Sequence, residues 1–451
     1  MRSNGRKKKK GIGGFITVLI TAVIVFFLLP AVREVVTGRD GAKTMPGSDR
    51  VKEYLRDYLD PDARVIYAQY DGIEEDIAAY QDPFTDAMTE EERRQQAEHS
   101  LQADYLEKEI QRALQNRERQ ICVIGRLGSS KGYVNNVAAG PGYDGGVFRT
   151  MPYSTFWMKS YEAYTGSLTE GRFGKTTFED HFFIYTFEYY DLQDDEILEM
   201  KNSIDLAADD ILSRIPAGAD LWQKCRTIHD ELVKRTEYDH DFADHSNDLY
   251  GALVNHKAVC EGYALAFQYV LNRTGENCDV IVSNWENKSD ATAHAWNRIH
   301  APTYEQYIDV TWDDTGSTDG NGEPVVSYDY FGLTEEEMAA VDSHEFESGL
   351  RADIGGPAAF NYYRHEGYLL TVYTEEAVTE LFSRQYSGGE QYMTVRFSDQ
   401  PAYREAFAGL FEGEGMNRVL DAMGYYGPYW YSTNEDLCII SVGLGTVSEQ
   451  I

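Results

Sequence analysis

The sequence predicts an α+β protein with an N-terminal transmembrane helix, an N-terminal helical region, a central core and a small C-terminal α/β domain. Three observations lead to this prediction. A long apolar run follows a basic cluster at the N-terminus. Amphipathic helical patterns then alternate with short apolar strands. In the middle of the chain, a cysteine at a predicted helix start is followed by a predicted hairpin that carries a histidine and an aspartate.

The N-terminus has the pattern of a membrane anchor. The basic stretch Arg6–Lys10 precedes the apolar run Gly11–Val32, which is long enough to cross a bilayer as a helix. No A-x-A cleavage pattern follows, so we expect an uncleaved signal anchor, with cleavage as the alternative. The positive-inside rule keeps the basic tail in the cytoplasm and places the rest outside. We therefore expect a single-pass protein of the cell membrane.

The charge distribution supports this division. Residues 1–32 hold six of the 41 Lys and Arg residues and none of the 75 Asp and Glu residues. The remainder therefore has 35 basic against 75 acidic residues, a formal net charge of −40. Such a surface argues against nucleic acid as a partner and against adsorption to anionic lipid. The hydrophobic content of 42% is sufficient for packed cores, so the chain is not of the disordered class.

The chain divides into six expected segments by composition and pattern. They are a cytoplasmic basic tail (1–10), a transmembrane signal anchor (11–32), a polar stalk (33–50), an N-terminal helical and strand region (51–190), a core (191–345) and a C-terminal α/β domain (356–451). In the region 51–190, the charged part up to about residue 120 favours solvated helix. Ile121–Gly125 and His181–Tyr190 favour strands.

Two helices are expected next, over about Asp194–Ile215 and within Asp220–Asp239. In the second, Cys225 shares a helical face with apolar residues, which favours a place in the core. The acidic, glycine-rich segment Asp313–Pro324 lacks the ligand spacing of a calcium loop, so a solvated turn is expected there. From about residue 356, apolar strands alternate with amphipathic helices, and no nucleophile or metal constellation is found.

Cys260 stands at the start of a predicted helix over Glu261–Leu271, which Gly275 is placed to end. The unpaired N–H groups and the positive end of the dipole at a helix N-terminus favour a thiolate. The other cysteines show no CxxC or Cys/His spacing, so a structural zinc is not expected. They are Cys122, Cys225, Cys278 and Cys438. Because five is an odd number, at least one thiol is unpaired within a monomer.

A cysteine nucleophile needs a base, and the base needs an orienting group. An apolar strand over Cys278–Asn284 is followed by two segments, His294–Ala301 and Gln306–Trp312, that are typical of an antiparallel hairpin. If the turn has two or four residues, the numbers of two paired residues add up to an odd number. His294 and Asp309 fulfil this condition, so their side chains point to the same face of the hairpin. A two-residue turn at Ala301–Pro302 would place them directly opposite, and a four-residue turn would make them diagonal neighbours. Cys260, His294 and Asp309 are thus a coherent candidate triad.

These residues also resemble a known family. The stretches LYGALVNHKAVCEGYALAFQYVL, HAWNRI and YIDVTWDD are similar, in this order, to the core of the transglutaminase-like superfamily. The resemblance covers roughly residues 222–312, and TEYDHD at Thr236–Asp241 is similar to the segment before this core in bacterial members. It implies a papain-like α+β fold with Cys260 as nucleophile, His294 as base and Asp309 as the acid. The rest of the chain resembles bacterial membrane-anchored proteins that carry this core.

The resemblance implies an extracytoplasmic cysteine enzyme that acts on amide bonds through a thioester. Water as acceptor would make it a peptidase or amidase, and a lysine amine would make it a crosslinking acyltransferase. The sequence leaves both outcomes open. The expected partners are a protein or peptide substrate, such as a surface protein or a cell-wall peptide, and the membrane through the N-terminal helix. No cofactor and no metal is expected. The alternative is a catalytically inactive scaffold that binds peptide.

Several neighbouring residues compete for roles at this site. Asn255 and Tyr250 are the candidates for the second oxyanion donor, beside the backbone N–H of Cys260. His256 is a rival base, although no carboxylate is obviously placed to orient it. His300, at the turn end of the hairpin, favours a surface role.

Three further features are assigned structural places. Trp296 and Trp312 are expected in the core, and the Asp309 carboxylate is expected at an exposed rim. The segment Asp239–Asp248 has ligand types suited to a metal, but its spacing fits no known site well.

Overall fold

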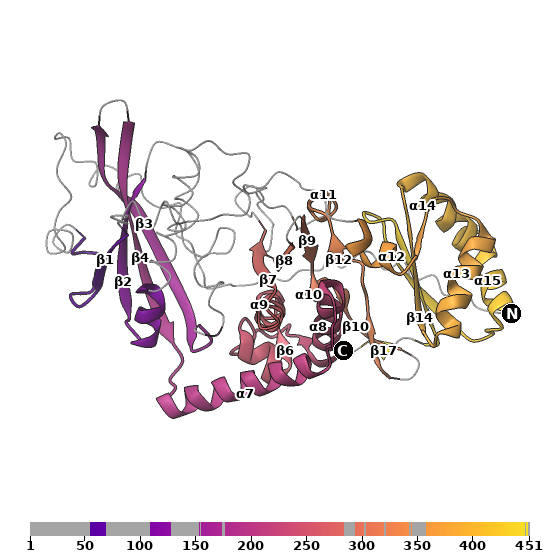
Figure 1. Cartoon of the computed structure of the whole chain (residues 1–451), viewed down its shortest axis with the longest axis horizontal. Coiled ribbons are helices and arrows are strands. Elements are labelled where there is room, and N and C mark those ends of the chain that lie inside the picture. The colour runs from indigo at the N-terminus through magenta and orange to yellow at the C-terminus, as the bar shows by residue number, and fades with distance from the viewer. Residues whose placement is uncertain are drawn as a thin grey trace.

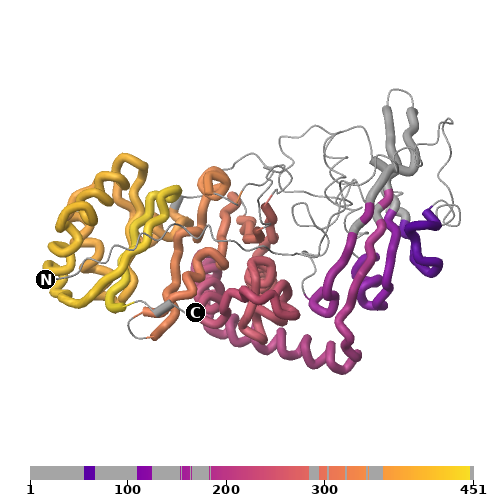
Figure 2. Tube along the Cα trace, turned by 180° about the vertical axis from the view of Figure 1, so that it is seen from behind, coloured from indigo at the N-terminus to yellow at the C-terminus, as the bar shows by residue number. Residues whose placement is uncertain are grey.

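The structure is a computed structural model that describes residues 55–68, 109–127, 153, 155–173, 176–283, 294–301, 304–319, 322–341, 344, 358–446 and 448–449. Its described parts lie in a row (Figure 1). An N-terminal sheet lies at one end, the core lies in the middle and a C-terminal domain lies at the other end. The view from behind in Figure 2 gives the same order.

The N-terminal sheet contains four strands in the order β1-β2-β4-β3. Their bounds are β1 Arg64–Ala68, β2 Gln120–Leu127, β3 Met158–Phe173 and β4 Thr176–Tyr189. The strands predicted at Ile121–Gly125 and His181–Tyr190 lie in β2 and β4. β3 was not predicted, because its polar and glycine-rich sequence has a weak strand signal and is ordered by pairing with β4. Residues 109–115 are helical, and the rest of the predicted helix lies largely outside the described residues.

Two helices lead from this sheet into the core. They are α7 Asp194–Ser213 and α8 Leu221–Arg235, close to the predicted ranges. α7 runs along one side of the molecule from the N-terminal sheet to the core (Figure 1). α8 begins at a capping box in which Asp220 and Gln223 each bond the other's backbone N–H. Cys225 on α8 is fully buried, as predicted.

The core combines one buried helix with an antiparallel sheet. Its helix is α9 Cys260–Asn272, and its sheet has the order β12-β9-β8-β7. The strands are β7 Asn277–Val282, β8 Ala295–Ala301, β9 Tyr304–Ile308 and β12 Phe331–Leu333. α9 is almost entirely apolar and packs against β7 and β8 in the main hydrophobic cluster. This packing brings the start of α9 near the start of β8 and the end of β9.

Short elements complete the core. They are β5 Glu237–Tyr238, η3 Gly251–Asn255, β6 Lys257–Ala258, α10 Val310–Asp313, β10 Asp314–Thr318, β11 Pro324–Val326, α11 Glu335–Ala339, η4 Ala358–Phe360 and α12 Tyr362–His365. The solvated turn expected over Asp313–Pro324 is wrong in part. β10 pairs antiparallel with β11 and with β17 Ser448–Glu449. Threonines of β10 and valines of β11 favour strands once they are paired.

The C-terminal domain has a mixed sheet in the order β13-β14-β16-β15 and a hydrophobic cluster of its own. Its elements are β13 Leu369–Leu370, α13 Glu375–Ser387, β14 Tyr392–Phe397, α14 Gln400–Phe407, η5 Ala408–Glu412, α15 Gly415–Met423, β15 Tyr429–Asn434 and β16 Ile439–Leu444. The predicted alternation of strands and helices is present, although α15 and β15 were not predicted. Polar contacts that tie the domain to the core include Arg396 with Glu337 at 2.7 Å, Asn434 with the Tyr330 hydroxyl at 3.0 Å, and Thr394 with the Tyr363 hydroxyl at 3.0 Å.

Among the described residues, no helix has both the length and the apolar character that a bilayer crossing requires. The predicted tail, anchor and stalk at residues 1–50 lie outside the described residues.

Candidate active site

Cys260 is the first residue of α9. The N-cap residue, Val259, has no side chain that can accept a hydrogen bond, so no side-chain cap occupies the N–H groups of the first turn. All five cysteines fall within the described residues, and Cys260 alone is partly exposed. Burial raises the thiol pKa of each of the other four, to about 12 in Cys122. Cys260 therefore has the position and exposure of a nucleophile, and the others do not.

His294 and Asp309 meet across the hairpin. His294 directly precedes β8, and Asp309 directly follows β9 and caps α10. His294 Nε2 lies 2.5 Å from Asp309 Oδ2. The strands pair Asn297 with Ile308 and Ala301 with Tyr304. In this register His294 and Asp309 are diagonal neighbours, which is one of the two arrangements that the sequence allowed. The backbone of His294 is fixed to Ser283, at the end of β7, by two hydrogen bonds of 2.9 Å.

The Asp309 carboxylate accepts four hydrogen bonds. Oδ1 accepts the backbone N–H groups of Thr311 and Trp312 at 3.0 and 3.2 Å. Oδ2 accepts from His294 and, at 2.8 Å, from His344 Nε2. Burial alone would raise the pKa of Asp309, but the two imidazoles outweigh it and hold that pKa well below its usual range. The expectation of an exposed-rim carboxylate is wrong, since Asp309 is 0% exposed.

The imidazole of His294 lies between Asp309 and Cys260. Burial alone would lower the pKa of His294, but the charge and hydrogen bond of Asp309, together with a hydrogen bond to Cys260, raise it. Because Nε2 is engaged by Asp309, the Nδ1 atom is left for the sulfur. The ring also packs against Trp312, at a centroid separation of 5.3 Å. The imidazole is therefore placed to exchange a proton with the Cys260 sulfur.

His344 is a site residue that sequence reasoning missed. It follows α11 in a stretch that matches no motif, so only the tertiary structure reveals its contact with Asp309. His294, Asp309 and His344 offer three potential ligand atoms within 4.8 Å of one another. However, the two N–O separations of 2.5 and 2.8 Å are hydrogen-bond distances. Ligands around a tetrahedral zinc lie about 3.3 Å apart, given bonds of about 2.0–2.1 Å. The cluster therefore fits a hydrogen-bonded set better than a metal site.

Tyr238 is a second residue that was missed. It lies on β5, which pairs with β6 so that Tyr238 is opposite Ala258, two residues before Cys260. Burial and then the nearby charge of Cys260 raise the pKa of Tyr238 to about 12. Its hydroxyl is therefore neutral and able to donate near pH 7. The β5–β6 pair is short and gave no recognisable strand pattern in the sequence.

The predicted oxyanion candidates lie on the segment before β6. Asn255 is exposed at the end of η3, and the ring of Tyr250 packs against His245 at 5.4 Å. Their reach toward the Cys260 site stays a prediction.

The competing histidines have other surroundings. His256 is exposed in a left-handed conformation after η3, and its carbonyl accepts from the Glu237 N–H group. His300 bridges Asp279 and Glu305 near the turn end of the hairpin. Of the potential bases considered, His294 is therefore the one that combines a carboxylate partner with a contact to Cys260.

The two tryptophans differ from each other. Trp296 is fully buried, as expected for a core residue. The core prediction for Trp312 is wrong, because its side chain is 37% exposed and lies beside the imidazole of His294. Trp312 lies within the short helix α10, Val310–Asp313, and does not continue strand β9.

The acidic segment Asp239–Asp248 is used to order its own loop. Asp239 accepts from the backbone N–H groups of Asp241 and Ala243. Asp248 accepts from the backbone N–H groups of Tyr250 and Gly251, and it contacts His245 Nδ1 at 2.7 Å. These contacts account for the carboxylates of Asp239 and Asp248 without a metal.

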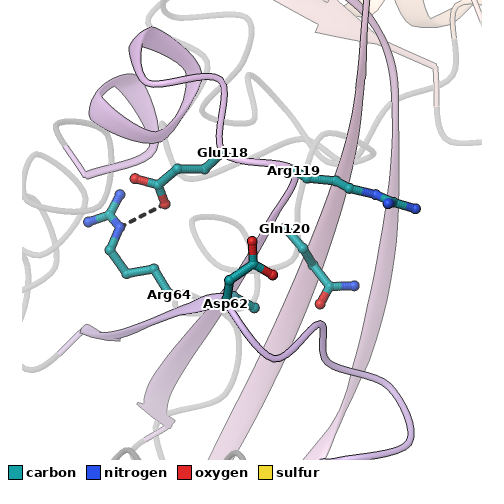
Figure 3. A pocket seen from close by; sticks show the side chains of 6 residues that line it. Asp62, Arg64, Glu118, Arg119 and Gln120 are labelled. Carbon is teal, nitrogen blue, oxygen red and sulfur yellow. Dashed lines mark hydrogen bonds and ion pairs between the residues drawn. The ribbon is translucent and has the colours of Figure 1, made fainter.

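A surface pocket lies in the N-terminal part of the chain (Figure 3), and none of the site residues described above lines it. Its lining comes from β1, β2 and the residues beside them, and the ion pair of Arg64 with Glu118, at 2.8 Å, closes one side. It contains neither a cysteine nor a histidine. The pocket is therefore separate from the Cys260 site.

Residues 209–311 match the family model described as the transglutaminase-like superfamily. The resemblance of this segment to the superfamily is thereby confirmed, and the chain contains a transglutaminase-like domain. None of the curated proteins compared with the chain matches it.

Three solved structures show a distant likeness. A protein described as a TGase is 15% identical over 43% of this chain and 51% of its own length, with a TM-score of 0.23. A protein of Cytophaga hutchinsonii described as a cysteine protease is 12% identical over 38% of this chain and 70% of its own, with a TM-score of 0.22. The periplasmic domain of TgpA from Pseudomonas aeruginosa, bound to ethylmercury, is 13% identical over 33% of this chain and 65% of its own, with a TM-score of 0.21. The chain thus spans about half of the first structure, and similarities this low carry no argument about activity.

Proposed function

We propose that this protein is an extracytoplasmic cysteine acyl-transfer enzyme that acts on amide bonds of proteins or peptides. The observation that carries the proposal is the 2.5 Å contact of His294 with the buried Asp309, beside a partly exposed cysteine at a helix start. The transglutaminase-like domain of residues 209–311 supports it. A nucleophile, a base and an orienting acid are the three parts that thioester chemistry requires.

The proposed reaction has two halves. The Cys260 thiolate attacks the carbonyl carbon of a substrate amide and forms a C–S bond. The C–N bond then breaks, and the leaving amine takes the proton of the His294 imidazolium, which gives a thioester and a neutral imidazole. In the second half, water or a substrate amine attacks the thioester while His294 takes its proton. The C–S bond breaks and restores the thiolate–imidazolium pair.

Negative charge on the carbonyl oxygen needs donors in the tetrahedral intermediate. The backbone N–H of Cys260 is the first proposed donor. For the second we favour the Tyr238 hydroxyl, because its strand pairs beside the nucleophile and its pKa of about 12 keeps it protonated. Asn255 and Tyr250 are the further candidates.

The proposed location outside the cytoplasm rests on the sequence. The apolar run Gly11–Val32 after a basic tail supports a signal anchor. Surface proteins or cell-wall peptides would then be the accessible substrates. Hydrolysis and transamidation share the thioester, and they differ only in the acceptor that reaches it.

A direct experiment separates these outcomes with the full chain in detergent micelles. Casein and the fluorescent amine monodansylcadaverine serve as donor and acceptor, and Cys260→Ala is the matched control. Amine incorporation by the wild type alone would indicate transamidation. Release of ammonia or new peptide ends without incorporation would indicate an amidase or peptidase. If neither product forms and the Cys260 thiol also fails to react with iodoacetamide at pH 6, the inactive peptide-binding scaffold becomes the better account.

A further inference from the structure

We propose that His344 is a positioning residue of this site, which holds the Asp309 carboxylate in the orientation that lets Asp309 direct His294 toward Cys260. The inference rests on the proposed function and extends it to a fourth side chain. His344 itself is 0% exposed, so its action is through Asp309 and not through contact with substrate.

The geometry at Asp309 is the first argument. The two oxygens of the carboxylate have separate sets of donors: backbone N–H groups on Oδ1 and imidazoles on Oδ2. The backbone pair fixes one oxygen, and His344 at 2.8 Å fixes the other independently of His294. The carboxylate is thereby held in place even when the His294 ring shifts during proton transfer. Without His344, His294 would be the single side chain that orients Oδ2 among the contacts of the described residues.

The surroundings of His344 are the second argument. Its ring lies among Trp296, Trp312 and Tyr330, with centroid separations of 4.8, 4.6 and 5.7 Å. Its backbone N–H donates to the Val341 carbonyl at 3.2 Å, and Val341 is buried in the main core. The imidazole is therefore held in a fixed place by packing, as a group that orients another group must be.

The aromatic contacts also link His344 to the reacting groups. Its ring lies 4.9 Å from that of His294, nearly perpendicular to it, and Trp312 contacts both rings. Among the described residues, the titratable groups whose contacts with His344 are seen are Asp309, His294 and Tyr330. Tyr330 is in turn bonded to Asn434 of the C-terminal domain at 3.0 Å. A buried histidine used only to fill space would not need a hydrogen bond to the same oxygen that His294 uses.

The test uses iodoacetamide as the probe, because alkylation of Cys260 needs no knowledge of the substrate. The rate of alkylation is followed by peptide mass spectrometry from pH 5 to 10 in the full-length wild type and three variants. His344→Leu fills the site without a donor. His344→Gln keeps an N–H donor near the position of Nε2. His300→Gln is the matched control on a histidine that bonds carboxylates away from the site.

We expect His344→Leu to react about tenfold more slowly than the wild type at pH 6, because a charge-assisted hydrogen bond that aligns the ion pair is lost. At pH 10, where the thiolate forms without help from His294, the difference should fall below twofold. His344→Gln should recover to within about threefold of the wild type at pH 6, and His300→Gln should match the wild type.

Two results would overturn the proposal. Equal rates for His344→Leu and the wild type at pH 6 would show that His344 does not position Asp309. An equal loss at pH 6 and pH 10, not restored by glutamine, would show a structural effect on access to the thiol. If the wild type itself is unreactive at pH 6, the failure lies with the proposed function and not with His344 alone.

Discussion

The substitution Asp309→Asn probes the centre of the proposed triad, because it keeps the size of the side chain while it changes one acceptor into a donor. Each carboxylate oxygen accepts two hydrogen bonds, so an amide cannot satisfy both sets. If the amide oxygen stays with the N–H groups of Thr311 and Trp312, the NH2 group faces His294 and His344. His294 must then accept at Nε2 and carry its proton on Nδ1, the atom that should take the proton from Cys260.

The magnitude follows from this change of tautomer. In a serine protease triad, the same substitution lowers the turnover about 10⁴-fold. We expect roughly 10²-fold here, since a thiolate–imidazolium pair forms more easily than an alkoxide. That loss corresponds to about 2.7 kcal/mol in the activation free energy. Because Asp309 is fully buried, the free energy of unfolding should also fall, by about 2 kcal/mol for the lost charge-assisted hydrogen bonds.

Two measurements check these values: the alkylation rate of Cys260 at pH 6, and urea unfolding at pH 7. Asp319→Asn is the matched control, because this aspartate accepts the backbone N–H of Glu323 in an exposed contact. The variant Asp309→Asn should be impaired in both measurements, and the control should match the wild type. If Asp309→Asn reacts within twofold of the wild type, the carboxylate does not direct His294 and the reasoning fails.

Three other predictions concern the oxyanion donor Tyr238, the buried His229 of the core and the membrane topology. Tyr238→Phe should lower acyl transfer about tenfold or more while leaving alkylation of Cys260 within twofold, and equal effects on the two rates would refute an oxyanion role. Burial alone would lower the pKa of His229, but Asp230 and Asp313 outweigh it and raise that pKa to about 9. The raised pKa stabilises the fold fully below about pH 6.5, and this stabilisation is lost as the pH rises through 9. In urea titrations, His229→Gln should therefore remove a pH dependence of the free energy of unfolding of up to about 1.4 kcal/mol per pH unit. An unchanged pH dependence would contradict this prediction. Protease added to intact cells should remove most of the chain, and protection until lysis would refute the signal anchor.

Local patterns in the sequence predicted the helix after Cys260 and the meeting of His294 with Asp309. The first follows from a run of helix formers, and the second from the two-residue period of strands. Both patterns are local, so they hold wherever the elements pack. The predicted range of the helix, Glu261–Leu271, differs from α9 by one residue at each end.

Features that depend on tertiary packing were missed. The burial of Asp309 arises because the segment with His344 and Tyr330 covers it, and no spacing in the sequence indicates that cover. Tyr238 comes close to Cys260 only through the short β5–β6 pair. β10 and β11 were missed because their strand character depends on pairing rather than on an apolar period.

The most direct test of the central claim compares His294→Ala with His256→Ala in one assay, the alkylation of Cys260 by iodoacetamide at pH 6. The wild type should label Cys260 ahead of the four buried cysteines. His256→Ala should behave like the wild type, while His294→Ala should lose about 10²-fold in rate, because the thiolate has lost its imidazolium partner. The reverse pattern, with His256→Ala impaired and His294→Ala reactive, would contradict the triad of Cys260, His294 and Asp309.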